Sequence, residues 1–271
     1  MGRRISQYQR ERSHQGGIVE GPDGKWYFFT HHGSGDWSGR VASLLPVEWA
    51  DGWPMIGDRS KGEIGSMVWS GGMPKVGAKR LMIVRSDDFD SQELAPQWQW
   101  NYQPRAYMHS LTERPGWMRL RAFRPLEPGN LFKAGNTLTQ RTWRTPANCV
   151  TIKVDISNMA DGQRAGLCHF SAHCSGLGVV QCEGERYIEH FEGQHFTRGE
   201  RLAQPYIWLQ SRWGLDGLST YHYSLDGDHF VPFGKPYRMV WGHYRGDRIG
   251  IYSYNDVAVE GWVDVDYLHY Q

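Results

Sequence analysis

Cysteine and histidine side chains gather in one short segment of the sequence, where they could hold a zinc ion. Cys168, His169, His173 and Cys174 lie within one strand-length stretch, and Cys182 follows it. Thiolate and imidazole are the usual ligands of structural zinc. In a β-strand, however, side-chain alternation would send Cys168 and Cys174 to one face and both histidines to the other. The spacing also matches no standard zinc motif, so we expect buried core thiols rather than a metal site.

A second set of reactive side chains is acidic and comes from two distant parts of the chain. Asp87, Asp88 and Asp90 follow one another closely, whereas Asp264 and Asp266 lie near the C-terminus. The first and last strands of a jelly roll often pair, so these carboxylates could meet, and clustered carboxylates suit calcium. The alternative is local turn chemistry and ordinary outward-facing strand positions. Calcium therefore stays open as a cofactor, and we assign no metal-binding residue and no other cofactor.

Composition excludes several classes of protein. The net charge of +1 gives no electrostatic reason to expect nucleic acid or a membrane surface as a partner. The N-terminal stretch has no apolar core of a secretory signal, so a cytoplasmic location is the default, and the sequence leaves other locations open. Four cysteines in 271 residues do not form a disulfide framework. The sequence also contains no phosphate-binding glycine loop, no nucleophile elbow and no His-Glu-x-x-His motif.

The elements that must position these residues are predicted to be strands. The chain has 33 Gly and 13 Pro, together with 13 Trp and 14 Tyr, a composition typical of all-β proteins with frequent turns. Residues 151–156 alternate polar and apolar without error, and Met118 and Leu120 alternate with two arginines. Residues 219–233 predict a hairpin, and residues 248–254 and 262–270 predict the closing strands. Residues 86–271 therefore indicate a two-sheet jelly-roll sandwich, with a β-barrel as the alternative.

The N-terminal part has a different organisation. Residues 1–13 are charged and without periodicity, so we expect a disordered leader. Residues 14–57 predict four short strands, which is the size of one blade of a β-propeller. Residues 58–85 are rich in glycine and form the candidate linker to the sandwich. No second copy of the blade pattern occurs in the sequence, so one blade alone cannot close a ring.

Two ordered sets of motifs carry a family resemblance. The first set is His14–Gly17 (His-Gln-Gly-Gly), Pro22–Tyr27, Gly39–Val41, Pro46–Trp49 and Asp51–Pro54. The second set is Ser86–Asp90, Gln97–Asn101, Asn136–Arg141, Asp161–Leu167 and Gly261–Tyr267. In this order, the first set resembles the last blade of the five-bladed propeller of glycoside hydrolase family 43, the family of β-xylosidases and α-arabinofuranosidases. The second set resembles the concanavalin A-like sandwich that follows many of these propellers.

The resemblance implies inverting hydrolysis of xylosides or arabinosides, in carbohydrate metabolism. Inversion needs a general acid and a general base roughly 6.5–9.5 Å apart, and the resemblance implies that both come from earlier blades. We therefore assign no catalytic residue, and we expect this fragment to be inactive alone. The acidic residues of the blade-like segment lie in turns and loops where nothing predicts a raised pKa. These residues are Glu20, Asp23, Asp36, Glu48, Asp51 and Asp58.

Two positions match residues that lie by the sugar in the family. The resemblance implies that His14 lies near the propeller axis and that Arg40 reaches the sugar, so both are predicted to bind substrate. The alternatives are a tail histidine and an exposed strand arginine. The implied ligand is a xylo- or arabino-oligosaccharide.

The alternative function is an accessory or carbohydrate-binding sandwich that docks on a separate catalytic propeller. Trp98, Trp100 and Trp117 are its candidate stacking platforms. Residues 98–107 are the candidate loop toward the sugar pocket of such a propeller.

Overall fold

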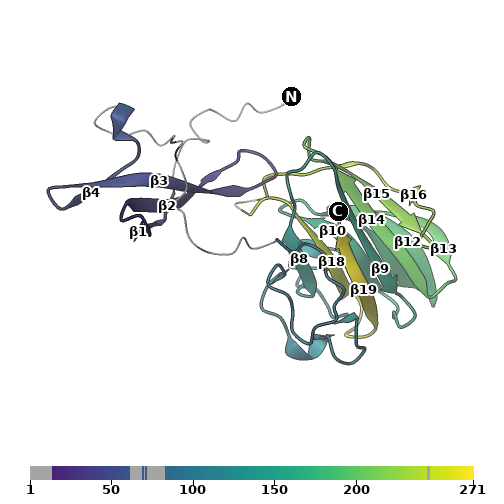
Figure 1. The fold of residues 1–271 in the computed structure, drawn as a ribbon. Helices are drawn as coiled ribbons and strands as arrows, with labels where there is room; N and C mark the ends of the chain where they lie inside the picture. The colour runs from purple at the N-terminus through teal and green to yellow at the C-terminus, as the bar shows by residue number, and fades with distance from the viewer. Residues whose placement is uncertain (1–13, 62–68, 70, 72–82, 243–244) are drawn as a thin grey trace. The chain divides into compact units, whose positions relative to one another are not determined.

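The computed structural model describes residues 14–61, 69, 71, 83–242 and 245–271 (Figure 1). The chain divides into two compact units, which are Met1–Met82 with Tyr244–Gly246, and Ile83–His243 with Asp247–Gln271. Each unit is described by itself below. The expected leader at residues 1–13 and most of the expected linker at 58–85 lie outside the described residues. The described part of the linker includes one short 3-10 helix, η1 (Arg59–Lys61).

The first unit contains a four-stranded antiparallel sheet in which each strand pairs with the next along the chain. Its strands are β1 (Gly17–Glu20), β2 (Trp26–Gly33), β3 (Arg40–Ala50) and β4 (Trp53–Ile56). The turn between β1 and β2 contains Gly24 at φ 72°, a left-handed conformation that glycine adopts without strain. The four strands predicted from the sequence are therefore confirmed.

The second unit is built from two larger sheets. The seven-stranded sheet has the order β13-β12-β11-β10-β18-β8-β5. Its strands are β5 (Gln99–Trp100), β8 (Thr137–Arg141), β10 (Gln163–Phe170), β11 (Ser175–Cys182), β12 (Glu185–Glu192), β13 (His195–Leu202) and β18 (Arg248–Asn255). Two 3-10 helices lie in its connections, η2 (Ala106–Met108) and η3 (Leu131–Lys133).

The eight-stranded sheet has the order β16-β15-β14-β9-β19-β7-β6, and β17 also pairs with β15. Its strands are β6 (His109–Ser110), β7 (Met118–Arg121), β9 (Asn148–Asp155), β14 (Tyr206–Trp213), β15 (Leu218–Ser224), β16 (Val231–Pro232), β17 (Tyr237–Arg238) and β19 (Trp262–Tyr270). The two predicted closing strands, β18 and β19, lie in different sheets, which brings the end of the chain into both layers (Figure 1).

The core of the second unit lies between these sheets. Strands β10, β11 and β18 of one sheet pack against β14, β15 and β7 of the other. Along β9 the inward side chains Val150, Ile152 and Val154 are at most 1 % exposed, whereas the alternate positions are partly exposed or polar. Burying one such side chain stabilises the fold by about 1.5–3 kcal/mol. The alternation predicted for residues 151–156 is therefore confirmed.

The sandwich prediction is confirmed, and the barrel alternative is wrong. Within the described residues, each sheet ends in strands that pair on one side only, β13 and β5 in one sheet and β16 and β6 in the other. A barrel would join such edges into a closed ring of hydrogen bonds. No helix of the described residues is long and apolar enough to cross a membrane.

Candidate functional site

The four-stranded sheet brings both predicted substrate-binding residues next to a third basic side chain, His31. The backbone N–H of His14 donates to the carbonyl oxygen of His31 over 3.0 Å, and the two imidazole rings stack with centroids 5.2 Å apart. Thr30 Oγ1 also donates to the carbonyl oxygen of His14 over 3.0 Å. Arg40 begins β3 opposite Gly33, at the same end of β2. These contacts hold the segment before β1 against β2.

Electrostatics at this group favour a neutral imidazole. The pKa of His31 is lowered, first by loss of hydration and then by the positive charges of Arg40, His14 and His32. Nε2 of His31 is buried and has no hydrogen-bond partner among the described residues. A neutral imidazole and a guanidinium can hydrogen-bond sugar hydroxyls, but they supply no carboxylate. Sequence reasoning missed His31. Its position beside His14 depends on the register in which β1 pairs with β2, and the sequence alone does not give that register.

The acidic residues of this unit act in local structure rather than as a facing acid and base. Asp23 accepts from Tyr27 Oη over 2.8 Å, and this hydrogen bond is the main cause of its lowered pKa. Asp36 accepts from the backbone N–H of Ser38, and Asp58 accepts from Ser60. A general acid needs a raised pKa, which burial or a neighbouring anion would provide. Asp23 has the opposite shift.

The cysteine–histidine segment is divided between two environments. Cys168 and Cys174 lie in one apolar cluster with Phe170, Phe191 and Leu131. Burial raises the pKa of Cys174 to about 12, and it also raises that of Cys168, so both thiols stay protonated. Their neighbours in the sequence, His169 and His173, make separate hydrogen bonds to other side chains. Within the described part of the chain, no group of three or more histidine, cysteine or acidic side chains could hold a metal.

The expected meeting of the first and last sandwich segments does occur, but the carboxylates do not converge. Asp87 forms a bridge with Leu268 of β19, and each backbone N–H donates to the other's carbonyl oxygen. Asp87 itself accepts from Trp98 Nε1 over 2.7 Å, and Asp88 contacts His269 Nε2 over 2.7 Å. Asp266 pairs instead with Lys153 over 2.7 Å. Each of these anions thus has its own donor, which corrects the calcium cluster considered from the sequence.

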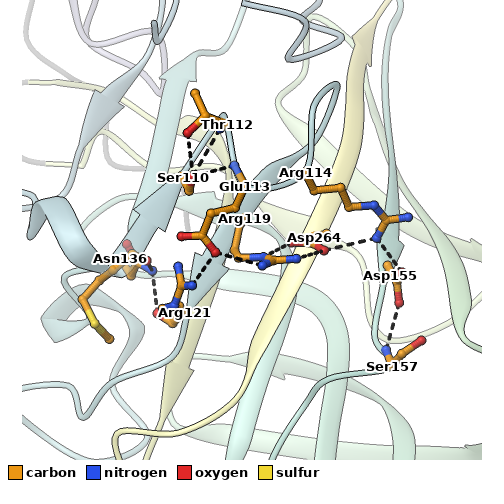
Figure 2. A network of polar contacts seen from close by, with 11 residues as sticks. Ser110, Thr112, Glu113, Arg114, Arg119, Arg121, Asn136, Asp155, Ser157 and Asp264 are labelled. Atoms are coloured by element: carbon orange, nitrogen blue, oxygen red, sulfur yellow. Dashed lines mark hydrogen bonds and ion pairs between the residues drawn. The ribbon is translucent and has the colours of Figure 1, made fainter. Parts of the chain in front are cut away.

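Asp264 belongs to a network of arginines and carboxylates on the eight-stranded sheet (Figure 2). It accepts from Arg119 Nε over 2.7 Å and from Arg114 over 3.1 Å, and Arg114 also reaches Asp155 over 2.7 Å. Glu113 accepts from Arg119 over 2.9 Å and from Arg121 over 2.5 Å. Hydrogen bonds and neighbouring cations lower the pKa of Glu113, against a smaller opposing effect of burial. The network ties β7 to β19 and β9.

Ser211, His169 and Asp247 are connected like a nucleophile, base and orienting acid. His169 Nδ1 lies 2.6 Å from Asp247 Oδ1, and His169 Nε2 lies 2.9 Å from Ser211 Oγ. Ser211 Oγ also lies 2.8 Å from Ser219 Oγ. All of these side chains are fully buried between the two sheets, and burial raises the pKa of Asp247 although His169 and Tyr237 donate to it. A substrate could not reach Ser211, so the constellation is structural.

Of the three predicted stacking platforms, Trp98 is buried, whereas Trp100 and Trp117 are partly exposed. Trp98 is 6 % exposed and donates to Asp87, so its expected exposure is wrong. Trp100 packs on His109 with ring centroids 4.6 Å apart, and the Arg114 guanidinium lies 3.6 Å from the Trp117 ring centroid. Trp100 and Trp117 are partly exposed, so their role as stacking platforms stays a prediction. The exposed aromatic residues of the 98–107 stretch are instead Tyr102 and Tyr107, at 47 % and 71 % exposure.

Comparisons with known proteins fit this all-β architecture of a small sheet and a jelly-roll sandwich. Residues 86–271 match the family described as the β-xylosidase C-terminal concanavalin A-like domain. The chain belongs to this family. It is 32 % identical to a β-xylosidase of Formosa agariphila over 97 % of this chain and 48 % of that protein. The chain spans about half the length of the curated relatives it matches.

Solved structures give the same assignment. A bifunctional family 43 protein with a CE part from Bacteroides eggerthii is 30 % identical, with a TM-score of 0.76 over 96 % of this chain and 34 % of that one. A family 43 glycoside hydrolase, engineered to display both endo-xylanase and exo-arabinofuranosidase activity, is 26 % identical. Its TM-score is 0.77 over 96 % of this chain and 54 % of that one. The chain thus corresponds to the C-terminal part of family 43 glycoside hydrolases.

Proposed function

We propose that this chain forms the C-terminal part of a family 43 glycosidase for xylosides or arabinosides, and that propeller blades from outside the sequence supply the catalytic acid and base. The observation that carries the proposal is the apolar surface of the four-stranded sheet. Apolar side chains are exposed on both of its faces, as they would be on a blade that packs between two neighbours.

The register of the sheet assigns these side chains to its two faces. Phe28 pairs with Leu45, and Phe29 pairs with Leu44, so successive residues of β2 and β3 point to opposite sides. One face carries Ile18, Val41 and Trp49, and the other carries Val19, Phe29 and Trp53, all between 37 % and 74 % exposed. A monomeric protein rarely leaves apolar surface open on both faces of one sheet. Neighbouring propeller blades would cover these exposed apolar side chains.

The basic group gives this unit a role in binding rather than in bond cleavage. His14, His31 and Arg40 offer hydrogen-bond donors for vicinal hydroxyls, and the planar fork of a guanidinium suits a pair of them. Inverting hydrolysis also needs two carboxyl groups on opposite sides of the sugar. In this proposal those groups come with the additional blades, and the relatives' names as β-xylosidases support the substrate class.

A second role concerns the sandwich as an accessory module. Tyr102 is exposed in the loop after β5 and Tyr107 is exposed in η2, and the side chain of Asn101 fixes the start of this segment by donating to the carbonyl oxygens of Phe132 and Ala134. Tyr102 has φ 64°, a conformation that a bulky residue rarely adopts. A rigid segment with two exposed rings favours docking on a catalytic propeller or contact with its sugar.

The test is reconstitution with missing blades. The purified chain is assayed with nitrophenyl xyloside and nitrophenyl arabinofuranoside, alone and after co-expression with the N-terminal half of the Formosa agariphila β-xylosidase. We expect no turnover by the chain alone, and co-purification with turnover in the pair. Turnover by the chain alone that disappears on replacing a single Asp or Glu would overturn the proposal.

Single substitutions test whether the four-stranded sheet is responsible for co-purification and for turnover. Phe29→Asp places a charge on one exposed apolar face, and we expect it to prevent co-purification. Arg40→Ala should leave co-purification intact and raise KM, because it removes a sugar contact. Lys25→Ala is the control for loss of a cation, since Lys25 is exposed in the turn between β1 and β2, and it should behave like the parent chain.

A further inference from the structure

We propose that the outer face of the eight-stranded sheet binds a neutral saccharide chain, at a site separate from the basic group of the four-stranded sheet. We call this surface the outer aromatic face and define it by Tyr206 and Trp208 of β14, Lys153 of β9, and Tyr267 and His269 of β19. Their strand neighbours Val154, Ile207 and Leu268 point into the core, so these five side chains point outward. The inference does not depend on the proposed glycosidase function.

The register sets the spacing of the rings. Lys153 pairs with Tyr267 on one side and with Trp208 on the other. Adjacent strands lie about 4.8 Å apart, so the backbones of Tyr267 and Trp208 lie about 10 Å from one another. Their side chains meet in a hydrogen bond, so the two rings form one continuous surface that a sugar can cover. The C–H face of a sugar is attracted by the negative face of an aromatic ring.

The rings are held in fixed positions by their neighbours. Lys153 Nζ lies 5.2 Å from the ring centroid of Tyr206 and 5.8 Å from that of Trp208. The rings of Tyr267 and His269 stack with centroids 3.9 Å apart. Tyr206, Trp208 and Tyr267 are partly exposed, so each ring keeps some surface toward solvent. A preorganised aromatic surface loses little side-chain entropy when a ligand binds.

A polar row lies beside the aromatic row and would meet the hydroxyl groups of a sugar. His269 pairs with Thr151, which pairs with Gln210, which in turn pairs with His222 across the sheet. Gln210 Nε2 donates to Thr151 Oγ1 over 2.9 Å. Gln210 is 6 % exposed and Nδ1 of His222 is buried, so the partly exposed Thr151 and His269 are the members of this row that present polar atoms to a sugar beside the rings.

Most cations around the outer aromatic face are paired with carboxylates, which favours a neutral occupant. Lys153 pairs with Asp266 over 2.7 Å, and Arg114 and Arg119 pair with carboxylates of the same sheet face in the network of Figure 2. A uronic acid or a nucleic acid would have to displace these partners. A neutral polyhydroxylated chain leaves these ion pairs intact while it covers the rings.

Affinity electrophoresis of the full chain tests the site. The native gels contain neutral arabinoxylan, anionic polygalacturonate or no polysaccharide. We expect retardation in the arabinoxylan gel alone. Titration with xylohexaose in a calorimeter then gives the dissociation constant of the parent chain and of its variants. Trp208→Ala and Tyr206→Ala should each weaken binding about tenfold, because each removes one ring contact.

The controls separate this site from the four-stranded sheet and from misfolding. Trp53→Ala removes a tryptophan that is 74 % exposed on the other unit, and it should bind as the parent chain does. Thermal unfolding checks that each variant is folded, and Tyr206→Phe keeps the ring if Tyr206→Ala does not fold. Equal mobility in all gels, retardation by polygalacturonate, or unchanged binding by folded Trp208→Ala would each overturn the proposal.

Discussion

The four-stranded sheet and the sandwich use the same kind of strand in opposite ways. Both are antiparallel, and both alternate side chains between two faces. The sandwich closes two sheets over one another, so Ile152 and Leu120 have no exposed surface. The four-stranded sheet has apolar side chains on both faces, and Trp53 and Phe29 are more than half exposed. The comparison teaches that strand pairing alone does not complete a core, because a core also needs a second layer.

The largest expected effect concerns the buried hydrogen bond between His169 and Asp247 in the sandwich. Asp247→Ala removes the acceptor of both His169 and Tyr237 inside the sandwich, and we expect the free energy of unfolding to fall by about 3–5 kcal/mol. The matched control is Asp88→Ala, whose exposed contact with His269 contributes less than about 1 kcal/mol. Urea unfolding measures both. Equal losses would show that burial does not distinguish the two pairs.

Next in size is a comparison of one apolar truncation in each unit. Ile152→Ala leaves a cavity between the sandwich sheets and should cost about 2–5 kcal/mol. Val19→Ala in the four-stranded sheet removes atoms from a side chain that is 50 % exposed, so its cost should stay within about 0.5 kcal/mol. Urea unfolding measures the loss of free energy of unfolding for both variants. A large loss for Val19→Ala would indicate that its face is already covered.

Hydrogen exchange tests the comparison without mutation. Amides of β2 and β3 should exchange at least about tenfold faster than those of β9, because regions with little buried apolar surface open at lower free energy. Mass spectrometry of peptides from the two units measures the rates. Uniform protection across both units would contradict the open faces of the small sheet, whereas slowing on addition of a propeller half would strengthen the proposed function.

The smallest expected effect is a pH dependence that originates in the sandwich. Burial lowers the pKa of His190, Lys235 adds to this and Glu192 opposes it. Because the unfolded chain then binds the proton more readily, stability should be full above about pH 6.5 and fall as the pH decreases below it. His190→Leu should flatten this slope, as measured by urea unfolding between pH 5 and pH 7, values that bracket about 6.5.

His229 is the matched control for that pH dependence. It is exposed, and its hydrogen bond with Asp226 raises its pKa, so it contributes with the opposite sign. His229→Gln should leave the slope as steep or make it slightly steeper. A slope that disappears in His229→Gln and persists in His190→Leu would contradict the assignment to the buried residue.

Much of the fold followed from the sequence because local signals agreed with one another. The glycine turn at Gly24, the alternation of 151–156 and the bounds of β19 were all predictable from residue type and period. Strand periodicity alone left open whether residues 86–271 form a sandwich or a barrel. The family resemblance favoured the sandwich and identified residues 14–57 as a propeller blade. His31 and the exposure of Trp98 were not predictable, since both depend on which distant segment lies alongside.

The sequence by itself determined where strands begin, which side chains share a face and that no facing pair of carboxylates follows from its motifs. Only the tertiary structure decided which of those faces is buried. Cys168 and His169 are adjacent in the chain, yet one lies among aromatic rings and the other is bonded to Asp247 and Ser211. The physical reason is that alternation is a property of one strand, whereas burial and pairing depend on the layer that packs against it.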